Sequence, residues 1–234
     1  MTDAHCHVTG GDPSVREFLI GRDFIGTHPW EADGLTPEDV RRKAEDLRSR
    51  LSSSVSSPAA SLLGVGEIGL DRLKEREISP RMRELFESQL QLAFEFNRPV
   101  VLHGAKCWGQ VVKTVQRLTI EQSNNPNNRT IPSFLFHGFS RSDGLIPDIV
   151  ALGGYISVGP AVLNDHAVNY RELVKKIPPD RLLLETDRTP ENAAECPSVA
   201  AVAAEVAKLR GISLSELETL TDRNAAAFIC YTTR

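Results

Sequence analysis

Short apolar runs alternate with longer amphipathic segments along most of this 234-residue chain. The runs are rich in leucine and β-branched residues and are apolar at consecutive positions, which is typical of strands buried on both faces of a sheet. Strands that alternate with helices indicate βα units and a parallel sheet. The predicted strands cover residues 2–7, 23–27, 61–68, 99–103, 133–139, 154–158 and 181–186.

The segment 80–97 is the clearest of the predicted helices. Its apolar residues, among them Leu85 and Phe86, recur with helical spacing and form one stripe. Ser79 and Pro80 stand where a cap and a first helical residue are expected. Further helices are predicted at 37–52, 198–210 and 214–231. No repeat or linker divides the chain, and we predict a single domain over residues 1–234, long enough for an α/β barrel.

Composition excludes several classes of protein. With 27 basic and 31 acidic residues, the net charge is −4, which argues against a protein that binds nucleic acid through bulk charge. It does not exclude an enzyme that binds phosphate groups through a metal ion. The four cysteines form no CxxC pair, so neither a disulfide framework nor a thiolate zinc site is expected. No apolar run is long enough for a membrane span, and no signal peptide is visible. We therefore expect a cytoplasmic protein, with access to the nucleus left open.

Histidines and carboxylates stand at the carboxyl ends of the predicted strands. One residue separates His5 from His7, so their side chains point to the same face of a strand and could bind one metal ion together. A barrel gathers the carboxyl ends of its strands into one ring, where active sites are built. The candidate ligands at these strand ends are His5, His7, Glu67, His103, His137 and Asp187. Chance alone is a poor explanation for so many metal-ligand types at these positions.

The motifs around these residues resemble those of a known family. They lie, in order, at 3–7, 26–29, 64–71, 99–103, 136–140 and 183–187. These motifs and their order resemble the successive motifs of the TatD family. Its members are metal-dependent deoxyribonucleases with amidohydrolase-like TIM barrels. The resemblance implies a TIM-type (β/α) barrel and hydrolysis of DNA phosphodiester bonds, from a strand end, by a water molecule that two metal ions activate.

The resemblance also implies how two divalent ions would be held. One ion would be bound by His5, His7, Asp187 and a shared Glu67, and the other by Glu67, His103 and His137. Glu67 and Asp187 would be the catalytic carboxylates, with Asp187 as the general base that accepts the proton of the water. Four histidines with two carboxylates suit zinc or manganese, whereas magnesium usually takes more oxygen ligands. In the family magnesium often supports activity, so Zn, Mn and Mg all remain candidates.

Three further polar residues are predicted to bind the substrate. His28 would line the substrate site by resemblance to the family, without binding metal. Lys106 could meet a phosphate as a point charge, and Asp71, which follows the Glu67 motif, could orient a metal ligand from behind it. Trp30 and Trp108 could either stack on a base or pack in the interior.

The chain departs from the family pattern in three places. Between His7 and Gly26 it has fewer than twenty residues, where the family has about a full extra βα unit. We therefore expect a barrel contracted near the N-terminus, with about seven strands rather than eight and a short helix at 13–19. Arg188, Gly138 and Arg141 also depart from the family, on the side expected to face the substrate.

Two alternatives to the nuclease remain open. Amidohydrolase-like barrels support many reactions, so the same metals could serve an ester, lactone or amide hydrolase. The shortened N-terminal region also allows a non-catalytic barrel that binds another protein. The leading hypothesis predicts DNA or another phosphoester as the binding partner, with no membrane and no other partner.

Overall fold

The computed structural model of the protein describes residues 1–56, 62–74, 76–125 and 130–230. They fall into two compact units, each with its own internal packing. Unit 1 consists of Met1–Ile20 and Phe136–Cys230, and unit 2 contains Gly21–Leu135. The expectation of a single domain stays a prediction. Within the described residues, no helix has the length and apolar character needed to cross a lipid bilayer.

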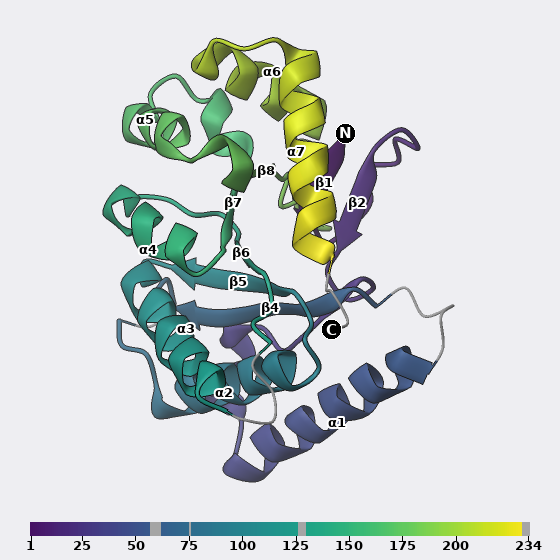
Figure 1. The fold of residues 1–234 in the computed structure, drawn as a ribbon, viewed down its shortest axis with the longest axis vertical. Helices are drawn as coiled ribbons and strands as arrows, with labels where there is room; N and C mark the ends of the chain where they lie inside the picture. The colour runs from purple at the N-terminus through teal and green to yellow at the C-terminus, as the bar shows by residue number, and fades with distance from the viewer. Residues whose placement is uncertain (57–61, 75, 126–129, 231–234) are drawn as a thin grey trace. The chain divides into compact units, whose positions relative to one another are not determined.

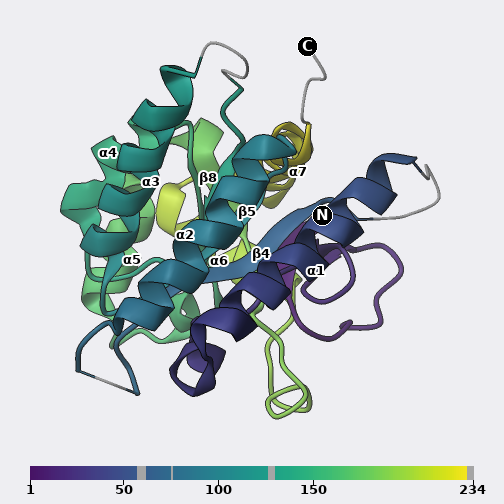
Figure 2. The same ribbon diagram turned by 90° about the horizontal axis from the view of Figure 1, so that it is seen from below.

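Unit 2 is built on three parallel strands in the order β3-β4-β5. These are β3 (Phe24–Ile25), β4 (Gly64–Asp71) and β5 (Val100–Ala105), and they alternate with η1 (Pro29–Gly34), α1 (Pro37–Ser56), α2 (Pro80–Glu95) and α3 (Trp108–Ser123). Helix α2 packs on β4, α3 packs on β5, and α1 lies beside α2 (Figure 2). The helices therefore cover the sheet of this unit, as βα units require.

Helix α2 begins where its sequence signals place it. The Ser79 hydroxyl accepts a hydrogen bond from the backbone N–H of Met82 at 3.1 Å, and Pro80 is the first helical residue. Its buried stripe contains Leu85, Phe86 and Leu90, in agreement with the predicted apolar face. The same stripe also buries a polar residue, Gln89, which is 2% exposed.

Unit 1 joins the start of the chain to its C-terminal half. The strands β1 (Thr2–Cys6) and β2 (Arg16–Leu19) form one parallel pair, and β7 (Tyr155–Val158) and β8 (Leu182–Leu184) form another. Helix α7 (Leu214–Ile229) packs against β1 and β8, as Figure 1 shows. The remaining helices are α4 (Ile146–Ala151), α5 (Val168–Lys176) and α6 (Val199–Arg210), with short 3-10 turns η2 (Asp143–Leu145), η3 (Pro160–Leu163) and η4 (Pro179–Arg181).

The expected count of about seven strands is wrong, because the described residues contain eight. Six of the predicted strands have counterparts in β1, β3, β4, β5, β7 and β8, and β6 (Phe134–Phe136) is a shorter form of another. The eighth strand, β2, occupies residues 16–19, where we expected a helix at 13–19. Between β1 and β3 the structure has only β2 and no helix.

Strand β2 owes its conformation to its partner. The backbone N–H of Arg16 donates to Met1 at 3.0 Å, and that of Ile20 donates to Cys6 at 2.9 Å. Pairing with β1 thus supplies the hydrogen bonds that a segment this short could not make as an isolated helix. Only Phe18 within β2 is fully buried, so one side chain anchors the strand.

Candidate metal centre

Strand β4 carries two acidic residues on one face, and both reach the same histidine. His103 on β5 pairs with Gly69 on β4, so its imidazole lies between Glu67 and Asp71. The distance from His103 Nδ1 to Glu67 Oε1 is 2.6 Å, and the distance from His103 Nε2 to Asp71 Oδ2 is 2.7 Å. Both ring nitrogens therefore have a carboxylate partner, an arrangement that fixes the ring plane.

Gly69 makes this close packing feasible. It has a φ of +151°, and a Cβ atom added there would lie 2.0 Å from the backbone oxygen of His103. The strand also shifts register between Val65 and Ile68, at the position of Glu67. Such an irregularity re-aims a side chain within a strand. Glu67 consequently sits inside β4 instead of at its end, because pairing with β5 continues as far as Asp71 and Ala105.

His28 joins Glu67 and His103 in one group whose potential ligand atoms all lie within 4.8 Å of one another. Its Nε2 is 3.5 Å from Glu67 Oε1, and its ring centroid is 4.7 Å from that of His103. Its Nδ1 accepts a hydrogen bond from the backbone N–H of Trp30 at 3.2 Å. A neutral imidazole that accepts at Nδ1 carries its proton on Nε2. His28 is thus arranged to donate a proton toward the centre rather than to bind a cation.

Gln89 holds the segment that carries His28, and sequence reasoning missed it. Its Oε1 accepts from the backbone N–H of Thr27 at 2.6 Å, and its Nε2 donates to the Thr27 carbonyl at 3.1 Å. Both backbone groups of Thr27 are thereby satisfied by a single buried side chain. The sequence signal that could have identified Gln89 is its position as a polar residue on the apolar stripe of α2.

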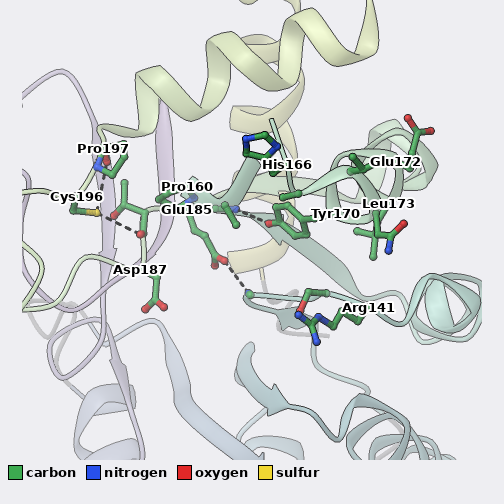
Figure 3. Close-up of a pocket in the computed structure, with 18 of the residues that line it drawn as sticks. Arg141, Pro160, His166, Tyr170, Glu172, Leu173, Glu185, Asp187, Cys196 and Pro197 are labelled. Carbon is green, nitrogen blue, oxygen red and sulfur yellow. Dashed lines mark hydrogen bonds between the residues drawn. The ribbon is translucent and has the colours of Figure 1, made fainter. Parts of the chain in front are cut away.

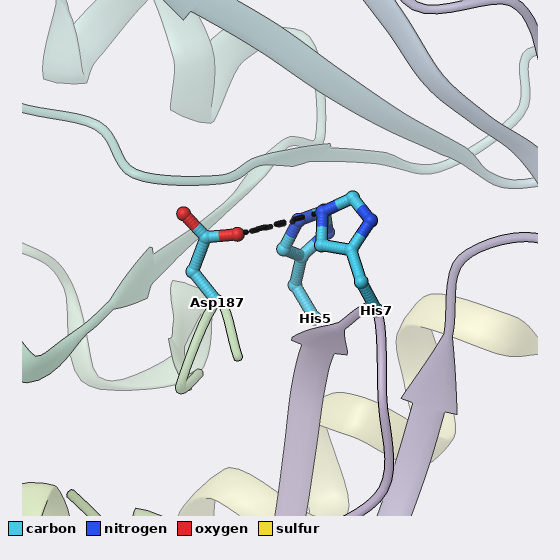
Figure 4. A group of neighbouring side chains, drawn as sticks. All are labelled: His5, His7 and Asp187. Atoms are coloured by element: carbon cyan, nitrogen blue, oxygen red, sulfur yellow. Dashed lines mark ion pairs between the residues drawn. The ribbon is translucent and has the colours of Figure 1, made fainter. Parts of the chain in front are cut away.

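In unit 1, His5 and His7 converge on one carboxylate oxygen (Figure 4). His5 Nε2 lies 3.3 Å and His7 Nε2 lies 3.6 Å from Oδ1 of Asp187. The backbone fixes this approach, because the N–H of Asp187 donates to the His5 carbonyl at 3.0 Å and that of His7 donates to the Arg188 carbonyl at 2.8 Å. The two histidines and Asp187 form a group whose ligand atoms lie within 4.8 Å of one another.

The electrostatics of this group favour an ionised carboxylate. Burial raises the pKa of Asp187, but hydrogen bonds from His5 and His7 outweigh it and hold this pKa well below the ordinary value. Nearby, burial raises the pKa of Asp3 to about 6, against the opposing effect of its hydrogen bonds with Thr186. The Asp3 carboxylate accepts from the Thr186 hydroxyl at 2.6 Å and from its backbone N–H at 3.0 Å. Asp3 therefore ties β1 to the segment that bears Asp187.

His137 follows β6 and stacks on His5, with ring centroids 3.9 Å apart and an interplanar angle of 17°. Beside it lies Glu185, a buried carboxylate to which the sequence analysis assigned no role. Its Oε2 accepts from the Ser157 hydroxyl at 2.6 Å, its Oε1 accepts from the backbone N–H of Gly138 at 2.8 Å, and His137 Nδ1 is 3.7 Å from Oε2. Burial raises the pKa of Glu185 to about 7, mainly by desolvation.

A cleft of about 1160 Å³ opens beside these carboxylates within unit 1. Its lining includes Asp187, Glu185, Tyr170 and Arg141, which Figure 3 labels. Arg141 has a φ of +58° and an exposed side chain. The cleft thus places a cationic side chain in the same cavity as the carboxylates.

The other predicted residues also have defined places. Lys106 is exposed, directly after the end of β5, with a φ of +57°. The guanidinium of Arg188 donates to the carbonyls of Ala193 at 2.8 Å and Cys196 at 3.2 Å, which braces the loop after Asp187. Trp108 is 4% exposed and packs over Gly104, whereas Trp30 is 48% exposed. Of the two tryptophans, only Trp30 is open to a ligand.

The donor sets of both groups fit a divalent cation. Each combines imidazole nitrogen with carboxylate oxygen, a set that binds zinc and manganese in proteins. Asp187 is ionised, as a metal ligand must be. In unit 2, Asp71 already occupies one nitrogen of His103, so a cation would meet the other nitrogen together with Glu67.

Comparisons with known proteins agree on one family. The profile of the TatD-related DNases matches residues 21–229. The uncharacterized metal-dependent hydrolase YabD of Bacillus subtilis (strain 168) is 28% identical over 225 residues, 93% of this chain and 81% of YabD. The 3'-5' ssDNA/RNA exonuclease TatD of Cronobacter sakazakii is 27% identical over 93% of this chain and 82% of its own. Several other relatives are matched over only 56% or 57% of their length.

The crystal structure of YJJV, a TatD homologue from Escherichia coli K12, matches the fold with a TM-score of 0.68. It is 24% identical, and the match covers 93% of this chain and 78% of YJJV. This likeness confirms the predicted α/β barrel class. The family profile covers most of the chain and confirms the resemblance seen in the motifs. The chain belongs to the family of TatD-related DNases.

Proposed function

We propose that this protein is a divalent-metal-dependent phosphodiesterase that hydrolyses single-stranded DNA from a strand end. The observation that carries the proposal is the convergence of His5 and His7 on one oxygen of Asp187, in a chain of the TatD-related family. Relatives named as metal-dependent hydrolases and as a single-strand exonuclease support the choice of substrate. Thiols at Cys107, Cys196 and Cys230 fit the proposed cytoplasmic location.

In this proposal His5, His7 and Asp187 hold one divalent ion, and Glu67 with His103 holds a second. When bound, such ions lower the pKa of coordinated water and neutralise charge that develops on a phosphoryl group. His137 stays a predicted ligand. The imidazole-rich donor sets favour zinc or manganese, and magnesium is tested alongside them.

The residues around the ligands have separate proposed roles. Asp187 is ionised at neutral pH, which both metal binding and acceptance of a proton from water require. Asp71 orients His103 through its Nε2, so we place it behind a ligand rather than against the substrate. His28 presents an Nε2–H toward the centre and can donate to a substrate oxygen. Lys106 stays a proposed phosphate contact.

The test is cleavage of end-labelled single-stranded DNA by the purified protein with Mn²⁺, Mg²⁺ or Zn²⁺. We expect stepwise shortening that EDTA abolishes and that Asp187→Asn reduces at least about 100-fold. Glu45→Gln, which alters an exposed carboxylate on α1, is the matched control and should cleave normally. Cleavage that is equal in Asp187→Asn and the unchanged protein would count against the proposed activity.

A second candidate function is hydrolysis of a small ester or lactone at the same centre. The observation that favours it is Arg141 in the cleft that contains Asp187, where a cation could bind a small anionic substrate. A panel of carboxylic esters, lactones and phosphodiesters separates the two functions. Ester or lactone turnover that exceeds DNA cleavage and falls in Arg141→Ala would favour this candidate.

A further inference from the structure

Trp30 is exposed beside the Glu67–His103 group. It lies in η1, directly after the His28 and Pro29 pair, and 48% of its surface is open to solvent. A single exposed apolar side chain is ordinary on a protein surface, so the neighbours of the indole decide whether it has a use. The other tryptophan, Trp108, is only 4% exposed.

The neighbours of Trp30 connect it to the metal group. The ring of His28 meets the indole edge-on, with centroids 4.9 Å apart and an interplanar angle of 78°. The same His28 ring lies 4.7 Å from that of His103. The Trp30 side chain also makes a hydrogen bond with Asp71, the carboxylate that lies 2.7 Å from His103 Nε2. The indole is thus held in place from the side of the proposed centre.

A cation completes the arrangement. Nζ of Lys74 lies 4.1 Å from the centroid of the indole, over its face. The adjacent Leu73 is 52% exposed. An exposed indole with an ammonium group over one face can hold single-stranded nucleic acid, with a base stacked on the other face of the ring and the cation meeting the backbone.

We propose that Trp30 and Lys74 form a nucleobase-stacking subsite that holds one nucleotide of a single-stranded substrate next to the Glu67–His103 group. The inference rests on the proposed function for the identity of the substrate. It assigns base contacts to the indole and phosphate contacts to Lys74. Binding is therefore insensitive to sequence, because every base offers a stacking face.

The subsite predicts that affinity depends on the presence of bases. Binding of a fluorescein-labelled dT octamer with a phosphorothioate backbone, which resists hydrolysis, is measured by anisotropy in the presence of Mn²⁺. An abasic octamer with the same backbone is the matched ligand. We expect Trp30→Ala to weaken binding of the dT octamer about 5-fold or more and to leave binding of the abasic octamer unchanged. Trp30→Phe should restore most of the affinity, and Leu73→Ala should bind as the unchanged protein does.

A second measurement needs no variant. The dT octamer should quench the tryptophan fluorescence of the unchanged protein, and the abasic octamer should not. Equal weakening of both octamers by Trp30→Ala, or dT binding without quenching, would overturn the subsite. If the protein cleaves DNA but Trp30→Ala binds the dT octamer as tightly as the unchanged protein does, only the subsite is refuted. If binding depends on the bases but the protein does not cleave DNA, only the proposed function is refuted.

Discussion

Glu67 Oε1 and His103 Nδ1 lie 2.6 Å apart on neighbouring parallel strands, inside the sheet of unit 2. Glu67 is 4% exposed, so this carboxylate has little access to water. A buried carboxylate needs a cationic partner, because burial disfavours its charge. The imidazole of His103 is the polar partner of Glu67 here, and a divalent cation bound by the two side chains would supply the positive charge.

We expect Glu67→Gln to lower hydrolysis of single-stranded DNA at least about 100-fold at saturating Mn²⁺. The substitution keeps the size of the side chain and removes the charge that a cation requires. Circular dichroism checks that the fold is retained, and Glu45→Gln on the exposed face of α1 serves as the control. Activity within twofold of the unchanged protein would remove Glu67 from the centre.

Gly69→Ala should destabilise the protein by about 1–3 kcal/mol or more, because the new Cβ would lie 2.0 Å from a backbone oxygen of His103. The positive φ of Gly69 adds strain to any other residue. Gly109→Ala is the matched control, since its added Cβ would meet no atom within 4 Å beyond its chain neighbours and the backbone of its own helix, and alanine favours a helix. Urea unfolding of both variants measures the difference, and equal stability of the two would contradict the packing described here.

Gln89→Met should destabilise the protein by about 1–3 kcal/mol, because it leaves the backbone N–H and carbonyl of Thr27 without their buried partner. Since Thr27 precedes His28, we also expect a lower kcat for DNA. Gln91→Met, at an exposed position of α2, should match the unchanged protein in both measurements. A stable Gln89→Met variant with full activity would mean that the Thr27 contacts do not hold this segment.

The apparent affinity for Mn²⁺ should fall as the pH is lowered from about 7.5 to 5. Free imidazole titrates near pH 6.5, and a histidine must be unprotonated to bind a cation, so each histidine ligand costs up to about tenfold in affinity per pH unit in the acidic range. Asp187 contributes nothing to this slope, because its pKa lies well below its ordinary value and it is ionised throughout. Isothermal titration at several pH values measures the trend, and a flat profile would contradict ligation by histidine.

Much of the fold could be predicted because burial dictates the pattern. Strands such as β4 and β5 are buried on both faces, so they read as continuous apolar runs. Strand β2 could not be found in this way. It has four residues with one fully buried side chain, and it is extended because β1 supplies its hydrogen bonds. A local pattern holds no information about such a partner.

The candidate site shows the same division. The histidines and carboxylates could be named as candidates, since their residue types and spacing are visible in the sequence, although Glu67 and His103 lie inside their strands rather than at the ends. The contact between Asp71 and His103 depends on the register of two strands, and that between Gln89 and Thr27 joins residues 62 positions apart. Glu185 could not be assigned because its partners, Gly138 and Ser157, come from different segments.

The number of metal ions per chain tests the account most directly. The purified protein is stripped with chelator, reloaded with Mn²⁺ or Zn²⁺, passed over a desalting column and analysed by mass spectrometry of the metal. We predict about two ions per chain for the unchanged protein and about one for Asp187→Asn. That variant loses the carboxylate that would bind the same ion as His5 and His7. A protein that retains no ion after reloading, or an Asp187→Asn variant that retains as much as the unchanged protein, would contradict the proposed centre.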